Sequence, residues 1–135
     1  MNAKKVFIDT NVLVYAYSAK DIVKKEKAIA VLNAYDCLVS TQVLNEFCNV
    51  CLKKLGFAAE IIQNIIEEVL NVCSCHIVDY ETIKHALLLQ ANCGFSYYDC
   101  LIVASASECE CQYLFTEDLT DQQVIDNVTI KNAFC

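Results

Sequence analysis

The chain contains no proline, no arginine and no tryptophan, and only two of its 135 residues are glycine. Without arginine it has no guanidinium to grip a phosphate with two parallel hydrogen bonds. The longest apolar runs span about six residues, whereas a membrane-spanning helix needs about 20. The N-terminal residues lead into a strand-like run without the apolar core of a signal peptide. These absences favour a soluble, cytoplasmic protein with no membrane partner.

Length and composition favour a single domain over residues 1–135, because 56% hydrophobic content is ample for one buried core. The chain has no internal repeat, linker or low-complexity segment. Its ten cysteines lie within apolar helical patterns, and nothing in the sequence indicates secretion. We therefore expect reduced thiols that pack as small core residues.

The net charge of −7 opposes binding to nucleic acid, but the charges are unevenly distributed. Residues 1–67 hold eight lysines and seven acidic residues, a net charge of +1, while residues 68–135 have a net charge of −8. A surface that contacts the phosphates of a nucleic acid is therefore expected in the first half, where Lys20, Lys24, Lys25 and Lys27 cluster. A solvated helix face explains the same lysines equally well.

Short runs of β-type composition alternate with stretches in which apolar residues recur at helical spacing. Strands are predicted at 6–9, 37–39, 76–78, 113–115 and 128–130, and helices at 12–17, 20–35, 41–55, 58–72, 80–92 and 98–107. This alternation predicts an α/β domain with a parallel β-sheet of about four to five strands flanked by α-helices. In such a sheet the loops that follow the strands meet at one edge.

Four acidic residues occupy positions that this fold brings together. Asp9 and Asp118 follow predicted strands, Glu46 lies in the second turn of a helix, and Asp99 begins another. Two carboxylates about 4 Å apart repel by about 4 kcal/mol at an effective dielectric near 20, so such a group must bind protons or a cation. Hard oxygen ligands suit Mg²⁺ or Mn²⁺. Taken singly, each acid is also explained as a helix cap, a turn residue or an exposed helix residue.

Four segments resemble a known family, and in chain order they are Phe7-Ile8-Asp9-Thr10-Asn11-Val12-Leu13, Leu44-Asn45-Glu46-Phe47, Tyr98-Asp99-Cys100-Leu101-Ile102-Val103-Ala104 and Leu114-Phe115-Thr116-Glu117-Asp118-Leu119. Over essentially the whole chain their order is similar to that of PIN domains. The length resembles the VapC-type toxins of type II toxin–antitoxin pairs. The segment Asn132-Ala133-Phe134 departs from the Asn-Pro-Phe ending of one subgroup.

The resemblance implies a single PIN-like nuclease domain that hydrolyses RNA as a divalent-metal-dependent endoribonuclease and is inhibited by a cognate antitoxin. It implies that Asp9, Glu46, Asp99 and Asp118 hold one or two Mg²⁺ or Mn²⁺ ions, directly or through water. Neighbouring polar side chains are expected to orient these carboxylates or water, and the candidates are Asn11, Thr116, Thr10 and Ser40. Glu117 is a rival to Asp118 for the last position.

Other interpretations stay open. A catalytically inactive PIN-like module that binds RNA or an antitoxin has the same motifs. The helix at 58–72 serves a homodimer or core packing equally well. A phospho-acceptor receiver domain fits less well, because only one acid follows the first strand. Zinc or redox sites are a further alternative, and the motifs are Cys48-x-x-Cys51, Cys73-x-Cys75-His76 and Cys109-x-Cys111.

Overall fold

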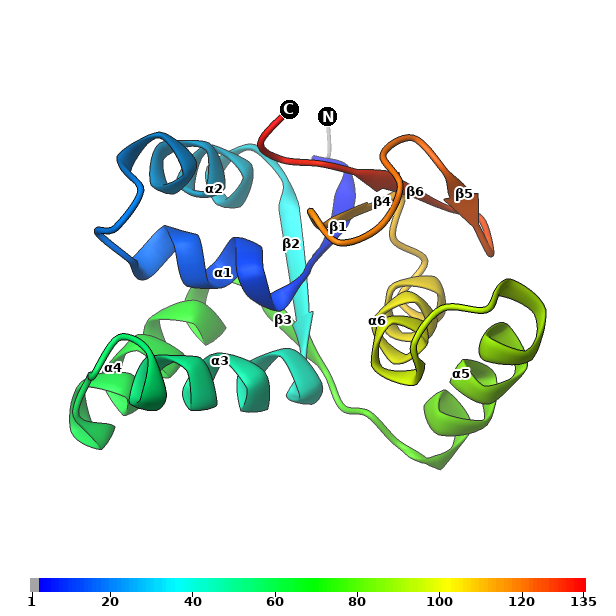
Figure 1. Cartoon of the computed structure of the whole chain (residues 1–135), viewed down its shortest axis with the longest axis horizontal. Helices are drawn as coiled ribbons and strands as arrows, with labels where there is room; N and C mark the ends of the chain where they lie inside the picture. The colour runs from blue at the N-terminus through cyan, green and yellow to red at the C-terminus, as the bar shows by residue number, and fades with distance from the viewer. Residues whose placement is uncertain (1–2) are drawn as a thin grey trace.

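The structure is a computed structural model that describes residues 3–135, and its strands form a single six-stranded sheet (Figure 1). The strand order is β3-β2-β1-β4-β6-β5. The strands are β1 (Lys5–Ile8), β2 (Asp36–Ser40), β3 (Ser74–His76), β4 (Tyr113–Phe115), β5 (Val124–Ile125) and β6 (Val128–Lys131). All neighbouring pairs are parallel except β5 and β6. The predicted α/β fold class is confirmed.

The helices connect the parallel strands as crossovers. They are α1 (Thr10–Tyr17), α2 (Ile22–Ala34), α3 (Thr41–Lys53), α4 (Ala59–Val72), α5 (Tyr80–Cys93) and α6 (Tyr97–Glu108). Figure 1 shows α1 to α4 to one side of the strands and α5 and α6 to the other. Right-handed crossovers require this arrangement, because β1, β2 and β3 proceed in one direction across the sheet and the chain then returns to β4. The strand order therefore reverses between β1 and β4, which is where ligands bind in such sheets.

The sheet has six strands, one more than the predicted four to five, and five of them are parallel as predicted. The additional strand, β5, has only two residues and pairs antiparallel with β6. The turn between them places Asp126 and Asn127 at φ values of 52° and 69°, the pattern of a tight two-residue hairpin. Two residues are too few to show a strand period in the sequence.

The third strand lies two residues earlier than predicted. The sequence favoured 76–78 because Ile77 and Val78 are β-branched, but β3 is Ser74–His76. Its register pairs Leu38 with Ser74, so the strand ends before Ile77, which is 71% exposed. A strand at the sheet edge is fixed by its hydrogen-bonding partner more than by apolar composition.

The core lies on both faces of β1, whose Val6, Phe7 and Ile8 are fully buried. Helix α6 contacts β2, β4 and β6, and every residue from Cys100 to Ala106 in it is buried. This confirms the prediction of a central helix, which followed from apolar residues on nearly all of its faces. Within residues 3–135, no helix has the length and apolar character needed to cross a membrane.

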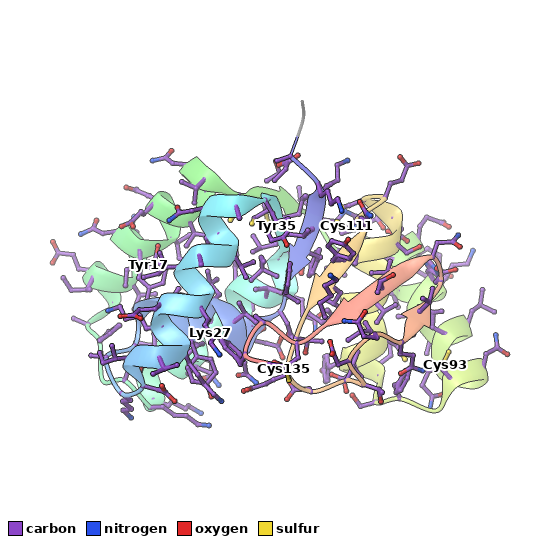
Figure 2. All side chains as sticks on the ribbon, turned by 90° about the horizontal axis from the view of Figure 1, so that it is seen from above. Tyr17, Lys27, Tyr35, Cys93, Cys111 and Cys135 are labelled. Atoms are coloured by element: carbon purple, nitrogen blue, oxygen red, sulfur yellow. The ribbon has the colours of Figure 1, made fainter. Side chains whose placement is uncertain are left out.

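All ten cysteines are free thiols, and five of them are buried. Burial raises the pKa of Cys37 and of Cys111 to about 12 and that of Cys73 to about 11. These three thiols are therefore neutral at physiological pH and pack as small apolar side chains. Cys93 and Cys135 are exposed, and Figure 2 shows them far from each other.

Candidate active site

A cavity of about 160 Å³ gathers all four predicted acids. Asp9 lies directly after β1, Glu46 belongs to α3, Asp99 to the first turn of α6, and Asp118 to the loop after β4. The remaining residues around the cavity are Thr10, Asn11, Gln42, Val50, Tyr98 and Ile102. Carboxylates separated by up to 109 positions in the chain therefore face one small space at the point where the strand order reverses.

Asp9 is the most buried of the four, with 8% of its surface exposed. It is the N-cap of α1, and its carboxylate accepts hydrogen bonds from Thr10 N at 2.7 Å and from Thr116 Oγ1 at 2.6 Å. The pKa of Asp9 is nevertheless raised to about 6. Burial is the main cause, and the negative charges of Asp118 and Glu46 raise the pKa further against the two hydrogen bonds. The arrangement thus holds a carboxylate where its negative charge lacks a counterion.

Glu46 is oriented from the end of β1. Thr10 Oγ1 donates a 2.9 Å hydrogen bond to Glu46 Oε1, and the backbone nitrogen of Thr10 donates to Asp9, so one residue contacts two of the acids. Gln42, one turn earlier in α3, directs its amide nitrogen to Glu46 Oε1 at 3.5 Å and to the backbone oxygen of Tyr98 at 3.1 Å. The second contact ties α3 to the start of α6, which carries Asp99.

Asp118 is held by two of the residues predicted to orient the acids. Asn11 Nδ2 donates to Asp118 Oδ2 at 3.3 Å, and the backbone nitrogen of Asp118 donates to Thr116 Oγ1 at 3.1 Å. The pKa of Asp118 is raised by partial burial first and then by the charges of Asp99 and Glu117, while the Asn11 hydrogen bond lowers it. Asn11 is therefore hydrogen-bonded to one of the four acids, and Thr10 and Thr116 are each hydrogen-bonded to two.

Two predicted site residues have capping contacts. Ser96 Oγ accepts from the backbone nitrogen of Asp99 at 3.2 Å, so Asp99 lies in a capped first turn and also lines the cavity. Ser40 is fully buried as the N-cap of α3, where its hydroxyl accepts from Val43 N at 3.2 Å. It contacts none of the four acids within residues 3–135.

The predicted RNA-binding lysines belong to α2 and the segment before it, and none lines the acidic cavity. Lys24 forms a 3.0 Å ion pair with Glu117, which raises the pKa of Lys24, and its ammonium lies 4.6 Å from the centre of the Tyr15 ring. Glu117, the rival of Asp118, is therefore directed to α2 and not to the cavity. Lys27 donates to the Phe134 carbonyl at 3.2 Å, and Figure 2 shows it beside the C-terminal segment.

Lys20 donates to the Lys54 carbonyl at 3.4 Å, and Lys25 is partly buried. RNA contact by the four lysines stays a prediction.

The donor set is suited to a hydrated divalent cation. Within residues 3–135, no three Asp, Glu, His or Cys side chains are close enough to hold one ion directly, and this includes the cysteine motifs. Four carboxylates nevertheless surround one cavity, and burial together with charge repulsion raises the pKa of two of them, Asp9 and Asp118. Mg²⁺ commonly binds through one or two carboxylates and keeps several waters, which fits oxygen ligands spread around a small space.

Two residues of this site were missed in the sequence. Gln42 and Tyr98 line the acidic cavity, and a hydrogen bond joins them. The only sequence signal is position, since Gln42 precedes Glu46 by four residues on the same helix face and Tyr98 immediately precedes Asp99.

The mostly parallel sheet and its acidic cavity at the strand-order reversal define an α/β protein with an all-oxygen site. Residues 6–126 match the family model described as PIN domain. The chain therefore belongs to the PIN-domain family, and the resemblance seen in its motifs is confirmed.

Several solved structures have the same fold. A toxin–antitoxin complex from Klebsiella pneumoniae superposes with a TM-score of 0.70 at 17% identity, covering 92% of this chain and 95% of that one. Mycobacterium tuberculosis VapC20, described as a Sarcin-Ricin loop cleaving toxin, gives 0.68 at 17% identity over 84% and 89%. DNA-bound VapBC from Salmonella typhimurium gives 0.70 at 18% identity over 96% and 98%. No curated protein matches the sequence.

Proposed function

We propose that this protein is a divalent-metal-dependent endoribonuclease and the toxin of a type II toxin–antitoxin pair. The observation that carries the proposal is the cavity in which four carboxylates from four different elements meet, with Asp9 buried among them. A binding module without turnover has no need to keep a carboxylate whose pKa is raised by burial and by the charges of neighbouring acids. RNA is the proposed substrate, which places the action of the protein in the cytoplasm.

In this proposal Asp9, Glu46, Asp99 and Asp118 hold Mg²⁺ or Mn²⁺, directly or through water. When bound, such an ion supplies Lewis-acid polarisation of the phosphoryl oxygen and lowers the pKa of a coordinated water. The protein's own contribution is orientation. Thr116 and the backbone nitrogen of Thr10 fix both oxygens of Asp9, and Thr10 Oγ1 fixes Glu46. Fixed carboxylates need little reorganisation when the cation and the phosphate arrive.

The structural relatives support the biological part of the proposal. They are a toxin–antitoxin complex, a Sarcin-Ricin loop cleaving toxin and a DNA-bound VapBC pair. An acidic cavity in a chain that has no arginine is complementary to arginine or lysine side chains from a cognate antitoxin. A homodimer through α4 also stays a proposal, since Ile61 and Leu70 on that helix are 51% and 45% exposed.

The test is RNA cleavage by the purified protein, with Asp9→Asn as the variant. Asn retains the size of Asp, so we expect a folded protein in which Mg²⁺- or Mn²⁺-dependent cleavage is abolished, and chelation by EDTA should abolish cleavage by the parent. Asp36→Asn is the matched control, because Asp36 is exposed at the start of β2 and lies outside the cavity. Absence of products from the parent at every metal concentration would instead support the inactive binding module.

A further inference from the structure

A second and larger cavity, of about 510 Å³, adjoins the acidic one. Its lining residues are Thr41, Gln42, Asn45, Glu46, Asn49, Val78, Tyr98 and Leu101. Gln42, Glu46 and Tyr98 line both cavities, so the two share a wall. A ligand that fills the larger cavity therefore lies directly beside the proposed catalytic acids.

The α3 wall of the larger cavity is a stripe of polar side chains. Residues 42, 45, 46 and 49 recur at helical spacing and face the same side. Asn45 and Asn49 are exposed, and neither makes a side-chain hydrogen bond within residues 3–135. Each free amide presents donors and an acceptor. Because the lining includes no lysine, this wall suits a neutral ligand that has both donors and acceptors, and not a phosphate.

The remaining wall is flat and apolar. Leu101 is buried and Val78 is partly buried, and together they provide a floor. Tyr98 is 64% exposed at the shared rim, and its ring lies edge-on to that of Tyr97 with centroids 5.4 Å apart. Its backbone oxygen accepts the hydrogen bond from Gln42, which fixes the start of α6. Thus one exposed aromatic face lies next to two free amides.

The junction between the cavities contains a buried acceptor without a donor. The amide nitrogen of Gln42 is directed to two oxygens, those of Tyr98 and Glu46, and this determines which end of the amide is nitrogen. Gln42 Oε1 is buried and has no hydrogen-bond partner within residues 3–135. Such groups are uncommon in folded proteins, and at the wall of a cavity a bound ligand is one partner that can satisfy them.

We propose that the larger cavity binds a nucleobase of single-stranded RNA next to the phosphate that is cleaved, by stacking on Tyr98 and hydrogen bonding to Asn45 and Asn49. The inference rests on the proposed ribonuclease function, since it concerns the substrate of the same site. Stacking on an aromatic ring and hydrogen bonding at the base edge are the usual means of recognising unpaired bases. A base in a duplex cannot present its face and edge in this way, so the proposal requires an unpaired nucleotide.

Binding of a fluorescently labelled single-stranded RNA to Asp9→Asn protein, which is expected not to cleave, tests the subsite. Adding Tyr98→Ala should raise the Kd by about 5-fold to about 150-fold, the effect of losing one base–aromatic stack. Tyr98→Phe should bind like the Asp9→Asn background, because the ring is retained. Combined Asn45→Ala and Asn49→Ala should also weaken binding. Tyr80→Ala and Asn64→Ala are the controls, since both residues are exposed on other surfaces and should leave the Kd unchanged.

A second arm varies the RNA. In the Asp9→Asn background, an abasic residue at one position of the RNA should weaken binding. At that same RNA position it should have no effect once Tyr98→Ala is added. Equal Kd values for Tyr98→Ala and Tyr98→Phe in the Asp9→Asn background would overturn the subsite. So would an abasic substitution whose effect on the Kd is the same with and without Tyr98→Ala. Cleavage by the parent is measured separately. If the protein binds RNA through Tyr98 but cuts none, the proposed ribonuclease function is refuted while the base-binding subsite is supported.

Discussion

Thr116 Oγ1 donates a 2.6 Å hydrogen bond to Asp9 Oδ2, which joins the carboxyl ends of the neighbouring strands β1 and β4. Thr116 is 1% exposed, and its hydroxyl also accepts from the backbone nitrogen of Asp118. One buried hydroxyl thus fixes the positions of two acids from opposite halves of the chain. The geometry of the acidic cavity depends on this contact.

Replacing Thr116 by Val should lower metal-dependent RNA cleavage by about 10-fold to about 100-fold, the usual effect of removing a group that orients a metal-binding side chain. The variant loses the donor to Asp9 and leaves that carboxylate held only by Thr10 N. Cleavage rate against Mg²⁺ concentration is the measurement. Thr120→Val, at an exposed threonine of the same loop, is the control, and an equal loss in both variants would contradict the role given to Thr116.

The stability of the metal-free protein should depend on Asp9 in a specific pH range. The pKa of Asp9 is about 6 in the folded protein, above the ordinary aspartate value of 3.8, so the unfolded chain releases this proton first as pH rises. Compared with a protein that has an uncharged residue at position 9, the free energy of unfolding of the parent therefore falls between about pH 4 and about pH 6. The total loss is about 3 kcal/mol. Urea unfolding in EDTA from pH 4 to pH 8 measures this for the parent and for Asp9→Asn.

The free energy of unfolding of Asp9→Asn minus that of the parent should grow by this amount up to about pH 6 and then stay constant. Parallel curves for the two proteins across the whole range would mean that Asp9 is not buried as described. Carboxylates away from the cavity titrate alike in both proteins, so the difference reports Asp9 together with its charge interactions with Asp118 and Glu46.

Mg²⁺ or Mn²⁺ should raise the Tm of the parent at pH 7 to 8, because a cation compensates the repulsion among the four acids. Ligand that binds only the folded state at 100 times its Kd stabilises by about 2.7 kcal/mol. Asp9→Asn should show a much smaller shift. Equal metal-induced shifts in the two proteins would show that the cation binds elsewhere.

A substitution at Ser40 distinguishes a helix-capping role from a role in orienting the acids. Ser40→Ala should destabilise the protein by about 1 kcal/mol, because Val43 N loses its acceptor at the start of α3. The Mg²⁺ dependence of cleavage should stay as in the parent, since Ser40 contacts none of the four acids within residues 3–135. A shifted metal dependence with unchanged stability would give Ser40 the orienting role that the sequence suggested.

The order of strands and helices could be predicted because the most buried segments are also the most clearly apolar ones in the sequence. Val6 to Ile8 form a continuous apolar run and are fully buried, and α6 is apolar on nearly every face and lies centrally. The convergence of Asp9 and Asp118 on one cavity also followed, since parallel strands end at the same edge. These features depend on local composition and on topology alone.

Features that depend on tertiary contacts could not be predicted from the sequence. The exposed Ile77 has strand composition but no strand partner, and the two-residue β5 exists only through its pairing with β6. Gln42 looks like any polar helix residue until α6 brings the Tyr98 carbonyl to it. The ion pair between Lys24 and Glu117 joins residues 93 positions apart, so the sequence did not reveal it.

The central claim is that four carboxylates act as one site, and RNA cleavage by four single variants in saturating Mg²⁺ tests it most directly. Asp9→Asn, Glu46→Gln, Asp99→Asn and Asp118→Asn should each reduce the single-turnover rate by at least about 100-fold while circular dichroism shows a folded protein, because each removes a charge from the same cavity. If any one of the four folded variants cleaves RNA as fast as the parent, the four acids do not form a single catalytic site.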